Sequence, residues 1–281
     1  MSRDAWASPD APVRTRVARA IAGEHLFYGY KVGDELAGHA GFWSLLSLSI
    51  GHRLLGDDEC GLLDDLKAAH MVADPRIQPL KLARMVASRG GALAGYCAGL
   101  LMIERSMIGP ACAEHAARML ADVARALGDA EPTEEAVAAA FDQTPFAAAS
   151  YLPGFGVPFR ERDERLPSIH RCMRARGRDA LRHARIERAL ARVVERRRSL
   201  PPNIAGTAAA ILLDMGFSPA QCGLVGVGLA VAYFLANAVE GAAQQSPVMQ
   251  RLPAAAIRYV GPAARETRRA RAARDAARGT P

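Results

Sequence analysis

Few aromatic residues and no long uncharged apolar run occur in this sequence, and both absences exclude a class of protein. Phe, Trp and Tyr make up 6% of the 281 residues, which leaves few flat side chains for stacking nucleic-acid bases. The most apolar segment, 221–239, is interrupted by Gly223, Gly226 and Gly228, and the start of the chain lacks the apolar core of a signal peptide. We therefore expect a cytoplasmic protein with no membrane partner.

Cysteine is also sparse and shows no functional spacing. The five cysteines are Cys60, Cys97, Cys112, Cys172 and Cys222. An odd and scattered set without a Cys-x-x-Cys pair or a Cys/His cluster argues against a disulfide framework and against structural zinc. We expect no metal cofactor.

The net charge of +7 is concentrated in residues 160–198 and in the tail, 265–281. In the first segment acids alternate with the arginines and no nucleic-acid motif is present, so a pocket for a phosphorylated small molecule fits at least as well as a nucleic-acid surface. The tail is poor in apolar residues and is predicted to be disordered. It is either adventitious or, as the less favoured alternative, binds nucleic acid or an acidic partner.

The chain is instead rich in helical periodicity. Apolar residues recur at intervals of three and four, and no stretch alternates as a strand does, which predicts an all-α fold. A helix that begins near residue 34 is expected to bury Phe42, and Asn203 is expected to cap a helix after two prolines. The other predicted helices cover 11–22, 57 to before 74, 78–88, 92–104, 110–127, 134 onward, 168–197, 204–215 and 220–240.

Residues 151–165 break this helical pattern. Proline and glycine, which do not continue a helix, occur there at Pro153, Gly154, Gly156 and Pro158. Three arginines follow among acids: Arg160, Arg162 and Arg165. Their guanidinium groups could bind an anion. A solvated turn between helices is the alternative.

Six short motifs occur in order between residues 28 and 265. They are Gly29-Tyr30 with Glu35-Leu36-Ala37-Gly38, Phe42 and His52-Arg53-Leu54; Gly109-Pro110; Pro153-Gly154-Phe155-Gly156; Asp163-Glu164-Arg165; Pro202-Asn203-Ile204; and Leu235-Ala236-Asn237-Ala238-Val239-Glu240. In this order and spacing they resemble the citrate synthase family, most closely its short members that are similar to citryl-CoA lyase.

The resemblance implies a two-domain helical architecture. A large domain would comprise 1–108 and 225–264, and a small domain, 109–224, would close over a cleft. It also implies a homodimer with sites near the subunit interface, and a coenzyme A thioester as substrate or ligand.

The catalytic residues of that family are missing. In the family an aspartate removes a proton from the acyl methyl group, one histidine stabilises the enolate, and another polarises the keto-acid carbonyl. Cys112 and Val157 stand at the positions of the two histidines and Ala205 at that of the aspartate. Pro75 stands where a further histidine binds the keto acid. Valine offers no hydrogen-bond donor and alanine no base, so the usual reaction is not expected.

A binding frame survives in the motifs. Arg165 matches the family arginine that holds a substrate carboxylate, although an ion pair with Asp163 or Glu161 is the alternative. The other predicted substrate-binding residues are Arg251, Gly154, Phe155, Gly156 and Asn203. On charge and position alone, Arg160, Arg162 and Arg198 are predicted to bind the phosphates of coenzyme A.

One candidate for new chemistry is a thiol near a helix start. Cys112 could be activated there, with His115 on the same helix face as its base. A buried, inert cysteine beside a solvated histidine is the alternative. His170 and His183 lie in a basic segment and are predicted to be surface residues.

Three functional hypotheses follow. The chain is an acyl-CoA-dependent carbon–carbon bond transferase or lyase with altered chemistry, or a pseudoenzyme that binds a metabolite or pairs with an active paralogue. The third hypothesis, a basic protein whose tail engages nucleic acid, is the least favoured.

Overall fold

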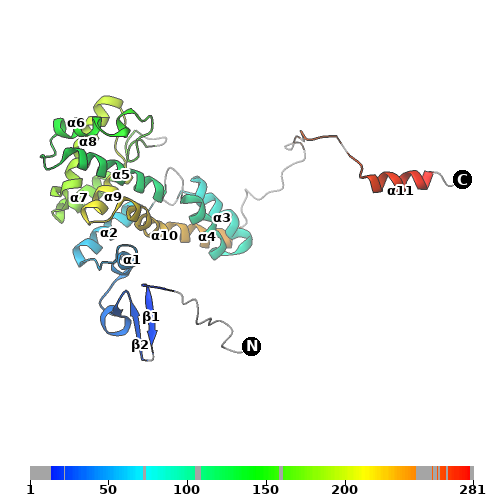
Figure 1. The fold of residues 1–281 in the computed structure, drawn as a ribbon, viewed down its shortest axis with the longest axis horizontal. Coiled ribbons are helices and arrows are strands. Elements are labelled where there is room, and N and C mark those ends of the chain that lie inside the picture. The colour runs from blue at the N-terminus through cyan, green and yellow to red at the C-terminus, as the bar shows by residue number, and fades with distance from the viewer. Residues whose placement is uncertain are drawn as a thin grey trace. The chain divides into compact units, whose positions relative to one another are not determined.

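The computed structural model describes residues 14–21, 23–71, 74–104, 109–157 and 161–244, and of the remainder 255, 258, 260–263 and 265–278. The chain divides into two units, Met1–Gln245 and Ser246–Pro281 (Figure 1). The second unit contains helix α11, Arg268–Arg278, where the sequence predicted a disordered tail. Alternating alanine and arginine, both good helix formers, explain this helix.

The first unit opens with a small antiparallel sheet. Strands β1 (Ala18–Ile21), β2 (Glu24–Phe27) and β3 (Tyr30–Lys31) pair in that order. The helix predicted over 11–22 is therefore wrong over residues 14–21, none of which is helical, and residues 11–13 and 22 lie outside the described part. Gly23 and Gly29 have φ of 81° and 89°, which lets the chain reverse tightly between the strands.

The rest of the first unit is helical, as predicted. Its N-terminal part contains η2 (Val32–Leu36), α1 (Phe42–Gly51), α2 (Asp57–Ala69), α3 (Gln78–Gly90), α4 (Ala92–Ile103), α5 (Pro110–Leu127) and α6 (Glu134–Asp142). Its C-terminal part contains η3 (Pro145–Ala148), α7 (Leu166–Ala175), η4 (Arg178–Ala180), α8 (Arg182–Arg198), α9 (Ile204–Asp214) and α10 (Pro219–Ala243).

Two helices differ from the prediction because glycines interrupt them. The helix expected from residue 34 begins only at Phe42, after Gly38 turns the chain with φ 82°, and Phe42 is 52% exposed rather than buried. The single helix predicted over 168–197 is split, because Gly177 adopts φ 65° after α7 and the chain restarts as η4 and α8.

Helix α10 is the centre of the packing. It contacts α3, α4 and α5, and α5 in turn contacts α6, α8 and α9 (Figure 1). One large apolar core joins α2 and α5 to α10, and a smaller cluster joins α3, α4 and α10 through Leu80, Ala83, Ile103, Ala230 and Phe234. The division into a large domain and a closing small domain stays a prediction.

By length and composition, α10 is the one helix of the described chain that could cross a membrane. Half of its most apolar window is nevertheless buried inside the unit. A core helix passes the same test, so the apolar composition of α10 is explained by its contacts with α3, α4 and α5.

A buried carboxylate from α9 caps the start of α8. Leu181, the N-cap residue of α8, has no side-chain acceptor. The Asp214 carboxylate instead accepts from the backbone N–H of His183 at 2.8 Å and of Ala184 at 2.9 Å, and lies 2.8 Å from His183 Nδ1. The His183 side chain, predicted to be at the surface, is 23% exposed, and its ring helps to fix α8 on α9.

We expect Asp214→Ala to lower the free energy of unfolding by about 2–3 kcal/mol, because several buried donors lose their acceptor. Urea unfolding monitored by circular dichroism measures this change. Asp142→Ala is the control: its pair with Arg197 is 53% exposed on the carboxylate side, and its loss should cost no more than about 0.5 kcal/mol. Equal losses in both variants would contradict the capping role.

Candidate functional site

The loop over 151–157 crosses the start of α9 at a pair of glycines. A Cβ on Gly154 would lie 2.9 Å from the Cα of Gly206, and one on Gly206 would lie 3.1 Å from the carbonyl oxygen of Gly154. Gly154 and Gly156 also have φ of 86° and 78°. No side chain fits at Gly154 without displacing α9, so the close crossing requires glycine.

Asn203 ties this loop to α9. Its backbone N–H donates to the Gly154 carbonyl at 2.9 Å, and its side-chain amide donates to the Gly156 carbonyl at 2.8 Å. Its side-chain oxygen accepts from the Ala205 N–H at 3.0 Å, which confirms the predicted helix cap. Phe155 is buried and pairs with Pro202 in an isolated β-bridge. The hydrogen bonds of Asn203 and the bridge of Phe155 are thus made within the protein. A contact of Gly154, Phe155, Gly156 or Asn203 with a substrate stays a prediction.

Three residues from the sequence analysis lie on elements that meet at this crossing. A Cβ on Gly154 would lie 3.5 Å from Ala116 Cβ, and Cys112 is one turn before Ala116 on α5. Val157 is the last residue of the loop, and Ala205 precedes Gly206 on α9. The residues of α5, the loop and α9 thus converge without a carboxylate or imidazole at any of the three positions.

Cys112 and His115 do not form a nucleophile–base pair in this structure. Cys112 is buried, its Sγ lies 3.6 Å from the Tyr151 hydroxyl, and His115 is exposed. Among the described residues no hydrogen bond joins the two side chains. Burial raises the pKa of the Tyr151 phenol far above its ordinary value, and Cys112 adds to the shift. The tyrosine is therefore a neutral hydrogen-bond partner for the thiol at neutral pH.

Arg165 forms a bidentate ion pair with Asp163. Its Nε and Nη2 donate to the two carboxylate oxygens, each at 2.7 Å, and the Asp163 side chain is fully buried. Asp163 also accepts from the N–H of Ile204, the first residue of α9, at 2.9 Å. Burial alone would raise the pKa of Asp163, but the Arg165 guanidinium and the backbone donors outweigh it and keep the pKa below its usual value. Asp163 is a structural anion rather than a free base.

Arg165 retains binding capacity. The Asp163 pair uses Nε and Nη2, and no hydrogen bond in the described part of the chain uses Nη1. The arginine side chain is 24% exposed. A guanidinium group with unused donors can therefore still receive a carboxylate or a carbonyl oxygen.

Two neutral polar side chains lie within electrostatic range of Arg165, and both were missed by the sequence analysis. Burial lowers the pKa of His70, at the end of α2, to about 4, and the Arg165 charge adds to the shift. Burial raises the pKa of Tyr233, on α10, to about 12 against the effect of Arg165. His70 Nδ1 lies 3.3 Å from the Leu66 carbonyl, which leaves Nε2 as an acceptor. The one available signal was that His70 lies five residues before Pro75, near the expected family histidine.

The arginines predicted to bind coenzyme A phosphates have other partners. Arg162 pairs with Glu195 at 2.6 Å on the surface. Arg198 donates to the carbonyls of Ala147 and, at 2.7 Å, Ala149, so its guanidinium fastens the segment before the loop. Their phosphate-binding roles stay predictions, and Arg160 and Arg251 lie outside the described residues.

The basic segment is largely neutralised by neighbouring acids. On α8, Arg185 pairs with Glu131, Arg196 pairs with Glu134 at 2.6 Å, and Arg197 pairs with Asp142 at 2.7 Å. Arg192 also pairs with Glu134. This face has little unpaired charge to offer a phosphate backbone. In the described part of the chain, no group of three His, Cys, Asp or Glu residues is placed to hold a metal ion.

Comparison with known proteins relates the chain to others by structure. No protein-family model and no curated protein sequence matches it. Citryl-CoA lyase from Hydrogenobacter thermophilus superposes with a TM-score of 0.70 at 22% identity, over 92% of this chain and 98% of that one.

Larger enzymes contain the same architecture. ATP citrate lyase from Methanosaeta concilii, solved as a variant with (3S)-citryl-CoA, gives a TM-score of 0.63 at 19% identity, over 90% of this chain and 43% of that one. Citrate synthase from Thermoplasma acidophilum, solved with carboxymethyl coenzyme A and oxaloacetate, gives 0.55 at 15% identity, over 79% and 57%. The chain therefore has the citrate synthase-like all-α fold that citryl-CoA lyase also has.

Proposed function

We propose that this chain binds a small carboxylate or an acyl-CoA beside Arg165, without the carbon–carbon bond chemistry of its structural neighbours. The observation that carries the proposal is the half-buried Arg165, whose Nη1 has no hydrogen-bond partner among the described residues and which lies near the neutral side chains of His70 and Tyr233. Structural neighbours were solved with citryl-CoA and with oxaloacetate, which supports ligands of this class.

The side chains at the converging positions favour binding over catalysis. Forming or breaking a carbon–carbon bond beside a thioester requires a base for the carbon acid and a donor for the developing oxyanion. Val157 and Ala205 supply neither group. Asp163 is unsuitable as a base because its carboxylate is buried in the pair with Arg165. Losing the base and the oxyanion donor costs several powers of ten in rate.

We also infer a homodimer, because α4 and α10 expose apolar side chains. Leu93 and Leu101 on α4 are 74% and 77% exposed, and Leu235 and Val239 on α10 are 40% and 60% exposed. Each pair lies on one face of its helix, and the two helices pack against each other. Exposed apolar surface of this kind is typical of an interface. A cytoplasmic location belongs to the same proposal, and an active paralogue is the alternative partner.

Calorimetric titration with citrate, oxaloacetate, CoA and acetyl-CoA tests the ligand proposal. We expect at least one of them to bind at micromolar concentration, and Arg165→Gln to weaken it by about 10- to 100-fold through loss of a charged hydrogen bond. Arg125→Gln, which removes an exposed partner of Asp122, is the matched control and should bind as the wild type does. Thermal unfolding of each variant separates loss of binding from loss of folding, because Arg165→Gln leaves Asp163 without its cation.

The same preparations decide between binding and altered chemistry. No ligand binding by the wild type would contradict the proposal, and unchanged binding by Arg165→Gln would place the ligand elsewhere. Turnover of an acyl thioester by the wild type, abolished in Cys112→Ser, would instead establish the altered-chemistry hypothesis at the thiol.

The neutral state of His70 predicts a pH dependence of stability. Its pKa is about 4 in the folded protein against 6.5 in the unfolded chain, so between these values the unfolded chain binds more protons. The free energy of unfolding should therefore fall as the pH falls from 6.5 through 4. We expect His70→Gln to lose less stability than the wild type over this range, by up to about 3 kcal/mol. If the free energy of unfolding changed equally with pH in the two proteins, a neutral His70 in the folded state would be contradicted.

The dimer proposal predicts a change of mass. A double variant, Leu101→Glu with Leu235→Glu, should sediment as a monomer while the wild type sediments as a dimer, because charges replace apolar contacts. Val17→Glu, at a 45% exposed position before β1, is the control and should leave the dimer intact. A monomeric wild type in analytical ultracentrifugation would rule out the homodimer.

A further inference from the structure

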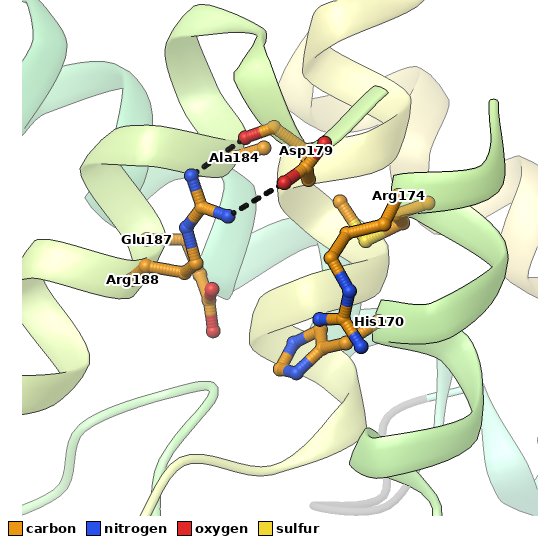
Figure 2. A pocket seen from close by; sticks show the side chains of 7 residues that line it. His170, Arg174, Asp179, Ala184, Glu187 and Arg188 are labelled. Atoms are coloured by element: carbon orange, nitrogen blue, oxygen red, sulfur yellow. Dashed lines mark hydrogen bonds and ion pairs between the residues drawn. The ribbon is translucent and has the colours of Figure 1, made fainter. Parts of the chain in front are cut away.

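A pocket lies between α7, η4 and α8, lined by side chains that the proposed function does not use (Figure 2). Its lining includes His170, Arg174, Asp179, Ala184, Glu187 and Arg188. Its accessible volume is about 30 Å³, and the rest of the hollow is open to solvent. The pocket therefore has room for one group about the size of a water molecule or an ammonium group, with the rest of a ligand at its mouth.

The acidic side of the pocket is a buried carboxyl group that forms no ion pair with the described residues. Glu187 is 5% exposed, and its one hydrogen bond in the described structure is accepted from the Thr207 hydroxyl at 3.3 Å. The same hydroxyl lies 3.5 Å from the Nε2 of His170, whose predicted surface position corresponds to a half-buried side chain at the pocket. Burial raises the pKa of Glu187 to about 7. A buried, weakly bonded carboxyl group destabilises the fold and is typical of a functional site.

The basic side of the pocket is an arginine without an anion. Arg174 is exposed, and in the described part of the chain its guanidinium group forms neither a hydrogen bond nor an ion pair. Arg188, by contrast, is occupied: it donates to the carboxylate of Asp179 at 3.2 Å and to its carbonyl at 2.7 Å, as the dashed lines in Figure 2 show. The pocket thus contains one unmatched acid, Glu187, and one unmatched base, Arg174.

We propose that this pocket binds a small zwitterion of the α-amino acid type, with its ammonium group at Glu187 and its carboxylate at Arg174. A purely anionic ligand would face the Glu187 carboxylate, and a purely cationic one would face Arg174 and Arg188. A molecule with opposite charges at its two ends matches both sides through charge-assisted hydrogen bonds. The site is separate from the proposed function at Arg165 and does not depend on it.

Calorimetric titration with glycine, alanine and serine tests this site on the full chain, with acetate and methylamine as ligands that carry only one of the two charges. We expect at least one amino acid to bind at millimolar concentration or tighter, and acetate and methylamine to bind at least about tenfold more weakly. Equal binding of a single-charge ligand, or no amino acid binding by about 10 mM, would overturn the proposal.

Matched variants locate the two charges. Glu187→Gln keeps an acceptor for Thr207, and Arg174→Gln removes the unmatched cation; each should weaken amino acid binding about tenfold or more. Arg171→Gln, on the same helix with its guanidinium on the Pro167 carbonyl, should bind as the wild type does. Glu187→Gln should fold at least as stably above pH 7, since it buries no charge, and circular dichroism checks this. Wild-type affinity in Glu187→Gln would overturn the assignment.

The pH dependence gives an independent readout. Amino acid binding should tighten between pH 6 and 8, because the ammonium group requires an ionised Glu187. The other charged or titratable groups facing it are His170, Arg174, Asp179 and Arg188. Burial, with help from Arg174 and Arg188, lowers the pKa of His170, which favours the neutral ring over this range. The dependence should vanish in Glu187→Gln, and its persistence there would contradict the site.

Discussion

Burial of one carboxylate, that of Asp163, fixes the geometry on which the candidate site depends. Its charge is removed from water, so it persists only because the Arg165 guanidinium and the N–H of Ile204 surround it. These contacts join the start of α7 to the start of α9 and orient Arg165 so that its Nη1 makes no hydrogen bond with the described residues. Arg165 is therefore coupled to the loop over 151–157 and to the first turn of α9. A substitution that displaces one of these three parts is expected to displace the other two.

Helix starts were predictable because their signals are local. Each signal acts within a few residues of the helix that it begins. Examples are the acids in the first turn of α2, Gly109-Pro110 at the start of α5, Asn203 before α9 and Ser218 before α10. The interruptions were not predictable, because a glycine such as Gly177 is tolerated inside some helices and ends others. The outcome depends on whether tertiary packing favours the left-handed conformation that Gly177 adopts.

The candidate site was predicted only where one motif contains it. Arg165 and Asn203 lie in recognisable motifs, whereas His70 and Tyr233 come from α2 and α10, and no local pattern relates residues so far apart. The burial of Cys112 and the exposure of His115 follow from the phase of α5, whose buried face contains Cys112, Ala116 and Met119. Sequence spacing shows which residues share a helix face, but the partners of that face are decided by packing.

The crossing of Gly154 over Gly206 has a consequence for how such a sequence can diverge. Any side chain at Gly154 would collide with α9, so selection for a folded protein alone preserves the glycine through long periods of mutational drift. A folding requirement alone is therefore enough to keep this part of the loop motif, and its presence does not by itself report which reaction takes place beside it.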